Sequence, residues 1–166
     1  KMEYHYITPE SGIKVKYKGA INFPRFYKHL RLWLEENGFA KEETLEKRYV
    51  ERIKPNGKQL EITWETEKEA SDYFTYHIQV GFIILGLNDV EVQEGNLKRK
   101  LQSATYEIKI TAYITYGGDK WESLGPLLKI YKNYISKKRL EEHYQLFYEK
   151  IYSFQEEIKN YLNLRT

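Results

Sequence analysis

The last stretch of the chain, residues 137–162, places the strongest constraint on the fold. Its large apolar residues recur with gaps that alternate between four and three: Leu140, Tyr144, Phe147, Ile151, Phe154, Ile158 and Tyr161. This spacing is a heptad seam on one face of a helix, and the other faces carry mainly Glu, Lys and Asn. A helix with seven bulky side chains on one face must bury that face. We therefore predict a long amphipathic helix that packs along a sheet or another helix.

The chain before this helix begins with a strand and a shorter helix. From Ile13 to Gly19 apolar residues alternate with lysines, which predicts a half-buried strand with a basic outer face. The following helix has Asn22 as its N-cap, Pro24 in its first turn and Gly38 just after its end. Its apolar stripe is aromatic and broad, so this helix is also expected to be buried on one side.

From residue 44 to residue 116 the period of the apolar residues changes to two, which predicts an antiparallel meander. Residues 45–53 are charged on both faces in places, as expected of an edge strand. Pro55-Asn56-Gly57 predicts a tight hairpin turn that leads into a return strand over residues 60–65. Further strands are predicted over 73–87, with a continuation past a bulge at Asn88-Asp89, over 97–101 and over 106–116.

One part of this meander is apolar on both faces. The residues concerned are Phe82, Ile83, Ile84, Leu85 and Leu87. An antiparallel strand has this pattern where a helix, a partner subunit or a ligand covers its second face. Gly81 and Gly86 flank the change of pattern and predict bulges or close backbone approach. We predict an interface at this stretch.

After the strand over 106–116, Gly117-Gly118 ends the sheet and Asp119 is expected to cap a short helical turn. Pro126 fits the first turn of a helix that runs through Ile135. The apolar residues of that helix do not continue the heptad phase of the last helix. A break is therefore predicted near Ser136, with Ser136 as the N-cap of the last helix.

The predicted fold is a single α+β domain over residues 1–166, with the order β-α-β-β-β-β-β-α-α. It has an antiparallel meander of about six or seven strands, an N-terminal amphipathic helix and two C-terminal helices packed on one face. This element order is similar to the helix-grip arrangement of START-like lipid-binding domains. The similarity lies in element order alone and implies an apolar pocket between the sheet and the last helix.

Composition excludes several classes of function and leaves others open. The chain has 166 residues, 41% of them hydrophobic, and a net charge of +3 that arises from 27 basic and 24 acidic side chains. It has no Cys, which excludes disulfides, thiol catalysis and cysteine-bound metal. No run of apolar residues is long enough for a membrane-spanning helix, and no signal-peptide core is visible, so we expect a cytoplasmic protein. The bias toward Lys, Glu, Ile and Tyr fits a thermophile or an AT-rich genome.

Catalytic and metal sites have little support in the sequence. The four histidines, His5, His29, His77 and His143, have no metal-ligand spacing and are expected to be ordinary surface or boundary residues. The carboxylates form solvated runs on helix faces, and no glycine-rich phosphate loop occurs. We predict no cofactor and no metal. Whether the protein is an enzyme is left open, with a lean toward none.

The aromatic content supports a pocket hypothesis. The chain has 16 Tyr, 7 Phe and 3 Trp. Eight tyrosines are predicted where the sheet meets its covering helices: Tyr76, Tyr106, Tyr113, Tyr116, Tyr131, Tyr134, Tyr144 and Tyr148. They would line a cavity for an apolar ligand or, in the alternative, fill a well-packed core.

Three basic clusters support a nucleic-acid hypothesis. They are Lys14, Lys16 and Lys18; Lys98, Arg99 and Lys100; and Lys137, Lys138 and Arg139. A lysine row on a strand also protects a sheet edge against pairing. Binding of RNA or DNA requires the three clusters to converge on one surface.

These observations lead to three hypotheses of function. The first is a non-catalytic binding or assembly module that uses the doubly apolar stretch or the last helix, either as a homodimer or with another protein partner. The second is a protein that binds an apolar small molecule in a pocket of helix-grip type. The third is an RNA- or ribosome-associated protein that acts through the basic clusters.

Overall fold

The computed structural model describes residues 2–39, 45–117, 125–130 and 137–164. Two strands, β1 (Met2–Tyr6) and β2 (Ile13–Ile21), come before helix α1 (Phe23–Glu36). Four strands follow: β3 (Glu46–Lys54), β4 (Gly57–Glu69), β5 (Phe74–Glu94) and β6 (Leu97–Gly117). The chain then forms α3 (Pro126–Ile130) and the long α4 (Lys137–Leu164). The predicted α+β class and antiparallel sheet are confirmed.

The six strands form one sheet in the order β1-β6-β5-β4-β3, and β2 also pairs with β6. All of these pairs are antiparallel. Because β6 has 21 residues, one of its edges is long enough for both β1 and β2. The predicted hairpin turn at Pro55-Asn56 is confirmed, and β3 lies at the edge of the sheet as predicted.

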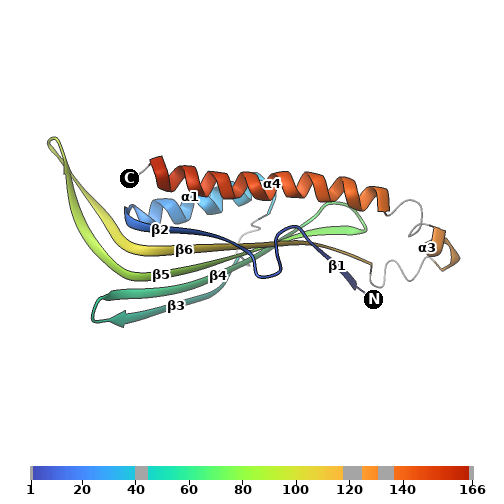
Figure 1. Ribbon diagram of the computed structural model, residues 1–166, viewed down its shortest axis with the longest axis horizontal. Coiled ribbons are helices and arrows are strands. Elements are labelled where there is room, and N and C mark those ends of the chain that lie inside the picture. Colours follow the sequence, from blue (N-terminus) through green and yellow to red (C-terminus); the bar gives the residue numbers. More distant parts are fainter. Residues whose placement is uncertain (1, 40–44, 118–124, 131–136, 165–166) are drawn as a thin grey trace.

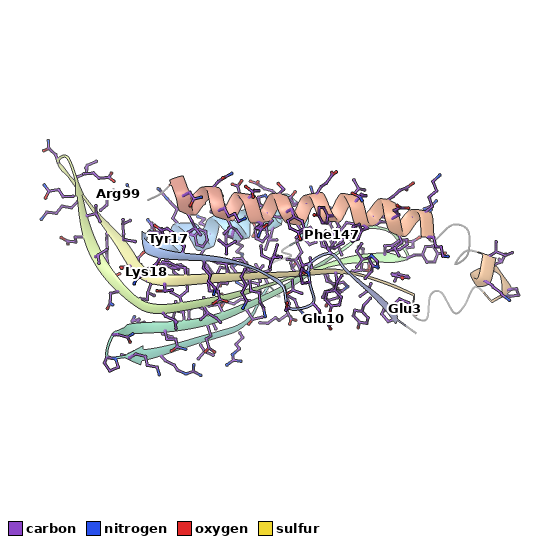
Figure 2. The ribbon with its side chains drawn as sticks, in the orientation of Figure 1. Glu3, Glu10, Tyr17, Lys18, Arg99 and Phe147 are labelled. Carbon is purple, nitrogen blue, oxygen red and sulfur yellow. The ribbon has the colours of Figure 1, made fainter. Side chains whose placement is uncertain are left out.

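Helices α1 and α4 lie on the same side of the sheet (Figure 1). The seam of α4 is buried from Phe147 to Tyr161, while Leu140 and Tyr144 are half-buried against the same core. Figure 2 shows Phe147 directed from α4 toward the sheet. The seam prediction is therefore confirmed, and the surface it buries belongs to the protein's own core.

The predicted ends of α1 are also confirmed. The side chain of Asn22 accepts a hydrogen bond from the backbone N–H of Arg25 at 3.1 Å, as an N-cap does. The side chain of Gln102 on β6 accepts a second one, from the N–H of Phe23 at 2.9 Å. Gly38 follows the C-cap with φ of 82°, a conformation that favours glycine. These contacts fix α1 over the buried face of the sheet.

The predicted element order is wrong in two places. The predicted order places one strand before the first helix, whereas α1 follows two strands, because residues 2–6 form a strand that we did not predict. This short segment is held as a strand by its pairing with the far end of β6. The predicted strands over 97–101 and 106–116 are one continuous strand, since β5 and β2 pair with β6 across the interval between them.

Strand β5 likewise continues to Glu94, but its bulge lies between Leu85 and Asn88 and not at Asn88-Asp89 as predicted, since Asn88 and Asp89 pair in regular register with β6. Gly86 has φ of 66° at this bulge, so its prediction is confirmed. Gly81 is different, because the pairing register runs past it without a shift on either side. The expected bulge at Gly81 is therefore wrong.

The part of the chain before α4 tests the remaining predictions only partly. Helix α3 begins at Pro126 as expected and is described to Ile130. The predicted capping turn at Asp119 and the predicted break at Ser136 lie outside the described residues. None of the helices in the described ranges combines the length and apolar character that crossing a bilayer requires.

Candidate functional site

The two faces of the sheet have opposite environments, because successive side chains of a strand point to opposite sides. On β5 the covered face carries Phe74, Tyr76, Ile78, Val80, Phe82 and Ile84, all buried beneath the helices. The other face carries Thr75, His77, Gln79, Gly81, Ile83 and Leu85. We call this second face the open face. In Figure 2 the open face is the side of the sheet on which Glu10 is labelled, away from α4.

A hollow of about 480 Å³ lies in the middle of the open face, and we call it the central hollow. Its floor surrounds Gly81, and the adjacent strands add neutral polar groups from Thr63, Gln79 and Thr111. The loop between β1 and β2 contributes Glu10 to its rim. At the centre of this hollow, Gly81 places no side chain on the open face.

The fold itself does not require glycine at position 81. Its φ is not in the left-handed region, and a Cβ built there meets only the Cβ of Lys109, at 4.0 Å. Glycine in a strand interior weakens the strand, because it adds backbone entropy to the unfolded chain and packs against nothing. The central hollow is thus a space that the protein keeps at a cost in stability.

Several charges around the central hollow form ion pairs with each other. Arg48 lies 3.5 Å and Arg52 3.2 Å from the carboxylate of Glu61. On the opposite side, the Nζ of Lys14 lies 3.4 Å from the carboxylate of Glu107. These pairs are partly exposed, so each contributes little to stability. Their effect is to fix charged hydrogen-bonding groups along both sides of the hollow.

A second hollow, of about 560 Å³, adjoins the first through Gln79, and we call it the histidine hollow. The Nε2 of His77 lies 2.7 Å from the hydroxyl of Thr115, and its Nδ1 lies 3.5 Å from the carboxylate of Glu67. Burial lowers the pKa of His77, and the nearby carboxylate of Glu67 opposes that shift in part. A neutral imidazole with its Nδ1–H toward Glu67 accepts a hydrogen bond from Thr115.

This hydroxyl–imidazole–carboxylate order resembles the relay of an acyl-transfer enzyme, but its surroundings differ. An oxyanion requires free, converging donors. The backbone N–H groups beside His77 and Thr115 belong to central strands and are used in the sheet ladder. The Thr115 side chain is also buried in the sheet, with 8% of the residue exposed. We therefore interpret the relay as a polar ladder across three strands that orients His77.

Aromatic rings gather next to His77. Its ring stacks on Tyr113 with centroids 4.6 Å apart and an interplanar angle of 7°. Tyr4 and Tyr6 on β1 contact the same Tyr113 ring at 5.7 and 5.3 Å. Tyr4 is 60% exposed. The open face therefore ends, at the β1 side, in an aromatic cluster of Tyr4, Tyr6, Tyr113 and His77.

The predicted interface residues divide between the two faces. Phe82 and Ile84 are buried in the core, and Leu87 packs against it. Ile83 and Leu85 are on the open face and are 43% and 44% exposed. The helices thus cover one side of the doubly apolar stretch, and its other side offers two apolar side chains at the surface.

The predicted pocket tyrosines are not brought together in one place. Tyr76 and Tyr106 are buried on the covered face, and Tyr116 and Tyr144 are half-buried. Tyr113 belongs to the open face, and Tyr148 is exposed on α4. Tyr131 and Tyr134 lie outside the described residues.

Closely packed rings occupy the space between α4 and the sheet. Tyr76 stacks on Phe147 at 4.4 Å, and Phe147 also stacks on Phe39 at 5.9 Å. The hydroxyl of Tyr76, whose pKa burial raises to about 12, lies 2.6 Å from the Nδ1 of His143. Burial, followed by the charge of Arg139, lowers the pKa of His143 and favours the neutral ring, whose Nδ1 accepts from the Tyr76 hydroxyl when Nε2 carries the proton.

The three basic clusters lie in different places. The cluster at residues 98–100 is on the β5–β6 hairpin and the one at residues 137–139 begins α4, at opposite ends of the molecule (Figure 1). Lys14, Lys16 and Lys18 lie on the open face of β2. Arg99 and Lys100 are also paired with Glu94 and Asp89 of the same hairpin, at 3.1 and 3.4 Å.

The sequence did not assign to any site the residues that shape the open face: Tyr4, Tyr6, His77 and Gly81. The alternation of tyrosines before Ile7 was a usable signal for a strand. For Gly81 the signal was a glycine in the middle of the best-patterned apolar strand, with no turn residue beside it. Among the described residues, no group of three or more His, Asp and Glu side chains is arranged to hold a metal ion.

Comparisons with protein-family models, with curated proteins and with solved structures found no significant match to this chain. The function of the protein is therefore inferred from the geometry of the open face.

Proposed function

We propose that this protein is a non-catalytic binding or assembly module that acts through the open face of its sheet. The observation that carries the proposal is that glycine occupies position 81, where a Cβ would fit, at the centre of the central hollow. The fold permits a larger residue there, the strand is weakened by glycine, and the result is an unfilled hollow at the centre of a face that α1 and α4 leave uncovered. A binding surface accounts for this cost.

The rest of the open face supports the same role. The hollows on it adjoin along β5, and partly exposed ion pairs line their sides. The exposed side chains of Ile83 and Leu85 add an apolar area at the end opposite to His77. A surface that combines a hollow, oriented polar groups and exposed apolar side chains has the usual elements of a recognition site.

A helix-grip arrangement is the finer fold that we propose for the covered side. In its support, α4 runs along one face of a curved antiparallel sheet (Figure 1). A ligand between α4 and the sheet has weaker support than a ligand on the open face. The stacked rings of Tyr76, Phe147 and Phe39 already fill the region beside α4, so a ligand there would have to displace them.

Native mass spectrometry of the protein as purified tests this proposal. We expect either a mass at a multiple of 20.0 kDa or a monomer with additional bound mass. The Gly81→Val variant fills the central hollow and should lose the bound mass or the assembled form. The matched control is Thr105→Val, which puts the same side chain on the open face outside both hollows.

A bare monomer at every protein concentration would contradict the proposal. So would a bound species that Gly81→Val retains in full. If Gly81→Val and Thr105→Val both lose the bound species, the loss does not come from the hollow, and the proposal is equally contradicted.

A further inference from the structure

The central hollow and the histidine hollow lie next to each other along β5, and we refer to the two together as the groove. They share Gln79, and together they run from His77 to Ile83. At about 3.3 Å per residue this distance corresponds to roughly 20 Å. The groove therefore suits an extended ligand of several units rather than one compact molecule.

Positive and negative side chains are equal in number around the central hollow of the groove. The central hollow is lined by three basic and three acidic side chains: Lys14, Arg48, Lys109, Glu10, Glu61 and Glu107. A polyanion such as RNA requires a clear excess of positive charge along its path. The balance in the central hollow gives such a ligand no net attraction.

The groove is also a poor match for an apolar ligand or a second sheet. Its floor consists of Gly81 and of the polar side chains of Thr63, Gln79 and Thr111. Burying these groups under an apolar surface without new hydrogen bonds is unfavourable. Ile83 gives one end of the groove an apolar side chain, and Glu61 and Glu107 flank Ile83 on the neighbouring strands.

Hydrogen-bonding capacity is what the groove offers to a ligand. Carboxylates that already have a cationic partner, such as Glu61 and Glu107, have lone pairs left that accept from hydroxyl groups. The guanidinium of Arg48 and the amide of Gln79 supply donors beside them. A ligand with pairs of neighbouring hydroxyls and no charge satisfies both kinds of group at once.

The aromatic cluster at one end fits the same chemistry. Tyr4, Tyr6 and Tyr113 present ring surface and phenolic hydroxyls together, and Tyr4 is the most exposed of the three. Ring surface packs against C–H groups, while the hydroxyls donate and accept hydrogen bonds. Sugars carry C–H faces and hydroxyl edges on the same ring.

We infer that the groove binds a neutral oligosaccharide, with its chain along β5 between the aromatic cluster and Ile83. This inference rests on the proposed function and names the ligand of the same face. Gln79 is the central contact because it borders both hollows.

The test is a binding screen with fluorescently labelled protein against neutral oligosaccharides of four to six units: cello-, xylo-, manno-, malto- and chito-oligosaccharides. Heparin and poly-uridine RNA are the polyanionic probes. We expect at least one neutral probe to bind, with an affinity that changes less than threefold between 50 mM and 500 mM NaCl. Gly81→Val and Gln79→Leu should each weaken that binding at least tenfold, and Thr105→Val less than twofold.

Three outcomes would overturn the inference: no neutral probe binds, only heparin or RNA binds with steep salt dependence, or Gly81→Val and Gln79→Leu bind as the unchanged protein does. Thermal unfolding of each variant shows that it is folded. The result for the oligosaccharide and the result for the proposed function can be distinguished. If native mass spectrometry shows a bound species that Gly81→Val loses while no oligosaccharide binds, the open face is a binding surface and its ligand is of another class.

Discussion

Strand β5 shows the difference between the two faces of the sheet within a single segment. Its covered face carries six apolar or aromatic side chains without interruption from Phe74 to Ile84. Its open face, over the same length, carries Thr, His, Gln, Gly, Ile and Leu. The covered face is determined by packing, so nearly every side chain there is necessary to the fold. The open face is not determined by packing, and its departures from a plain polar surface therefore point to function.

The largest expected effect comes from the covered face. Phe147→Ala removes a fully buried ring that stacks on both Tyr76 and Phe39, and it leaves a cavity between α4 and the sheet. We expect a loss of about 3–5 kcal/mol in the free energy of unfolding. Urea denaturation followed by circular dichroism measures it.

The control for this change is Ile83→Ala on the open face, which should cost about 1 kcal/mol or less because Ile83 is largely exposed. Equal losses from the two variants would show that something covers the open face in solution.

A smaller effect of opposite sign is expected at the centre of the open face. Gly81→Val should raise the free energy of unfolding by about 0.5–1 kcal/mol, since valine favours the strand and a Cβ at this position meets only the Cβ of Lys109, at 4.0 Å. The measurement is again urea denaturation. A destabilised variant would mean that the fold requires Gly81. The hollow would then need no functional explanation.

The third prediction concerns pH and also compares the faces. His77 on the open face and His143 on the covered side both have a pKa lowered chiefly by burial. The unfolded chain then binds protons more readily than the folded one, so stability falls as pH decreases below the ordinary histidine pKa of about 6.5. Below the folded-state pKa the loss is complete.

Unfolding curves between pH 8 and pH 5 measure this dependence. His77→Gln and His143→Gln should each be less sensitive to pH over that interval than the unchanged protein. If neither substitution reduces the sensitivity, the two imidazoles are not held neutral by the fold.

The smallest effect is expected from the ion pairs beside the groove. Glu61→Gln removes the charge that faces Arg48 and Arg52, and the cost should be about 0.5 kcal/mol or less because the pair is partly exposed. Thermal unfolding at low and high salt measures it. A loss of several kcal/mol would indicate that these charges hold the sheet together, and their placement would need no ligand to explain it.

The covered face could be predicted well from the sequence. The heptad seam of α4, the caps of α1 at Asn22 and Gly38, and the turn at Pro55-Asn56 are local patterns, and local patterns determine local structure. The continuity of β6 was missed because Gln102, Ser103 and Thr105 give no strand pattern alone. They are held in the strand by β5, the other strand of the same hairpin, and by β2, which lies far away in the sequence.

The sequence by itself therefore determined which segments are amphipathic and which side of each must be buried, because the apolar periodicity of a segment decides both. The tertiary structure decided which residues meet on the open face of the sheet. It brought His77, Thr115 and Glu67 into one row of polar contacts from three strands, and it placed Tyr4 and Tyr6 beside Tyr113. It also put Gly81 at the middle of a groove. These neighbours depend on strand order and register, which arise from long-range pairing and are not encoded in any one segment.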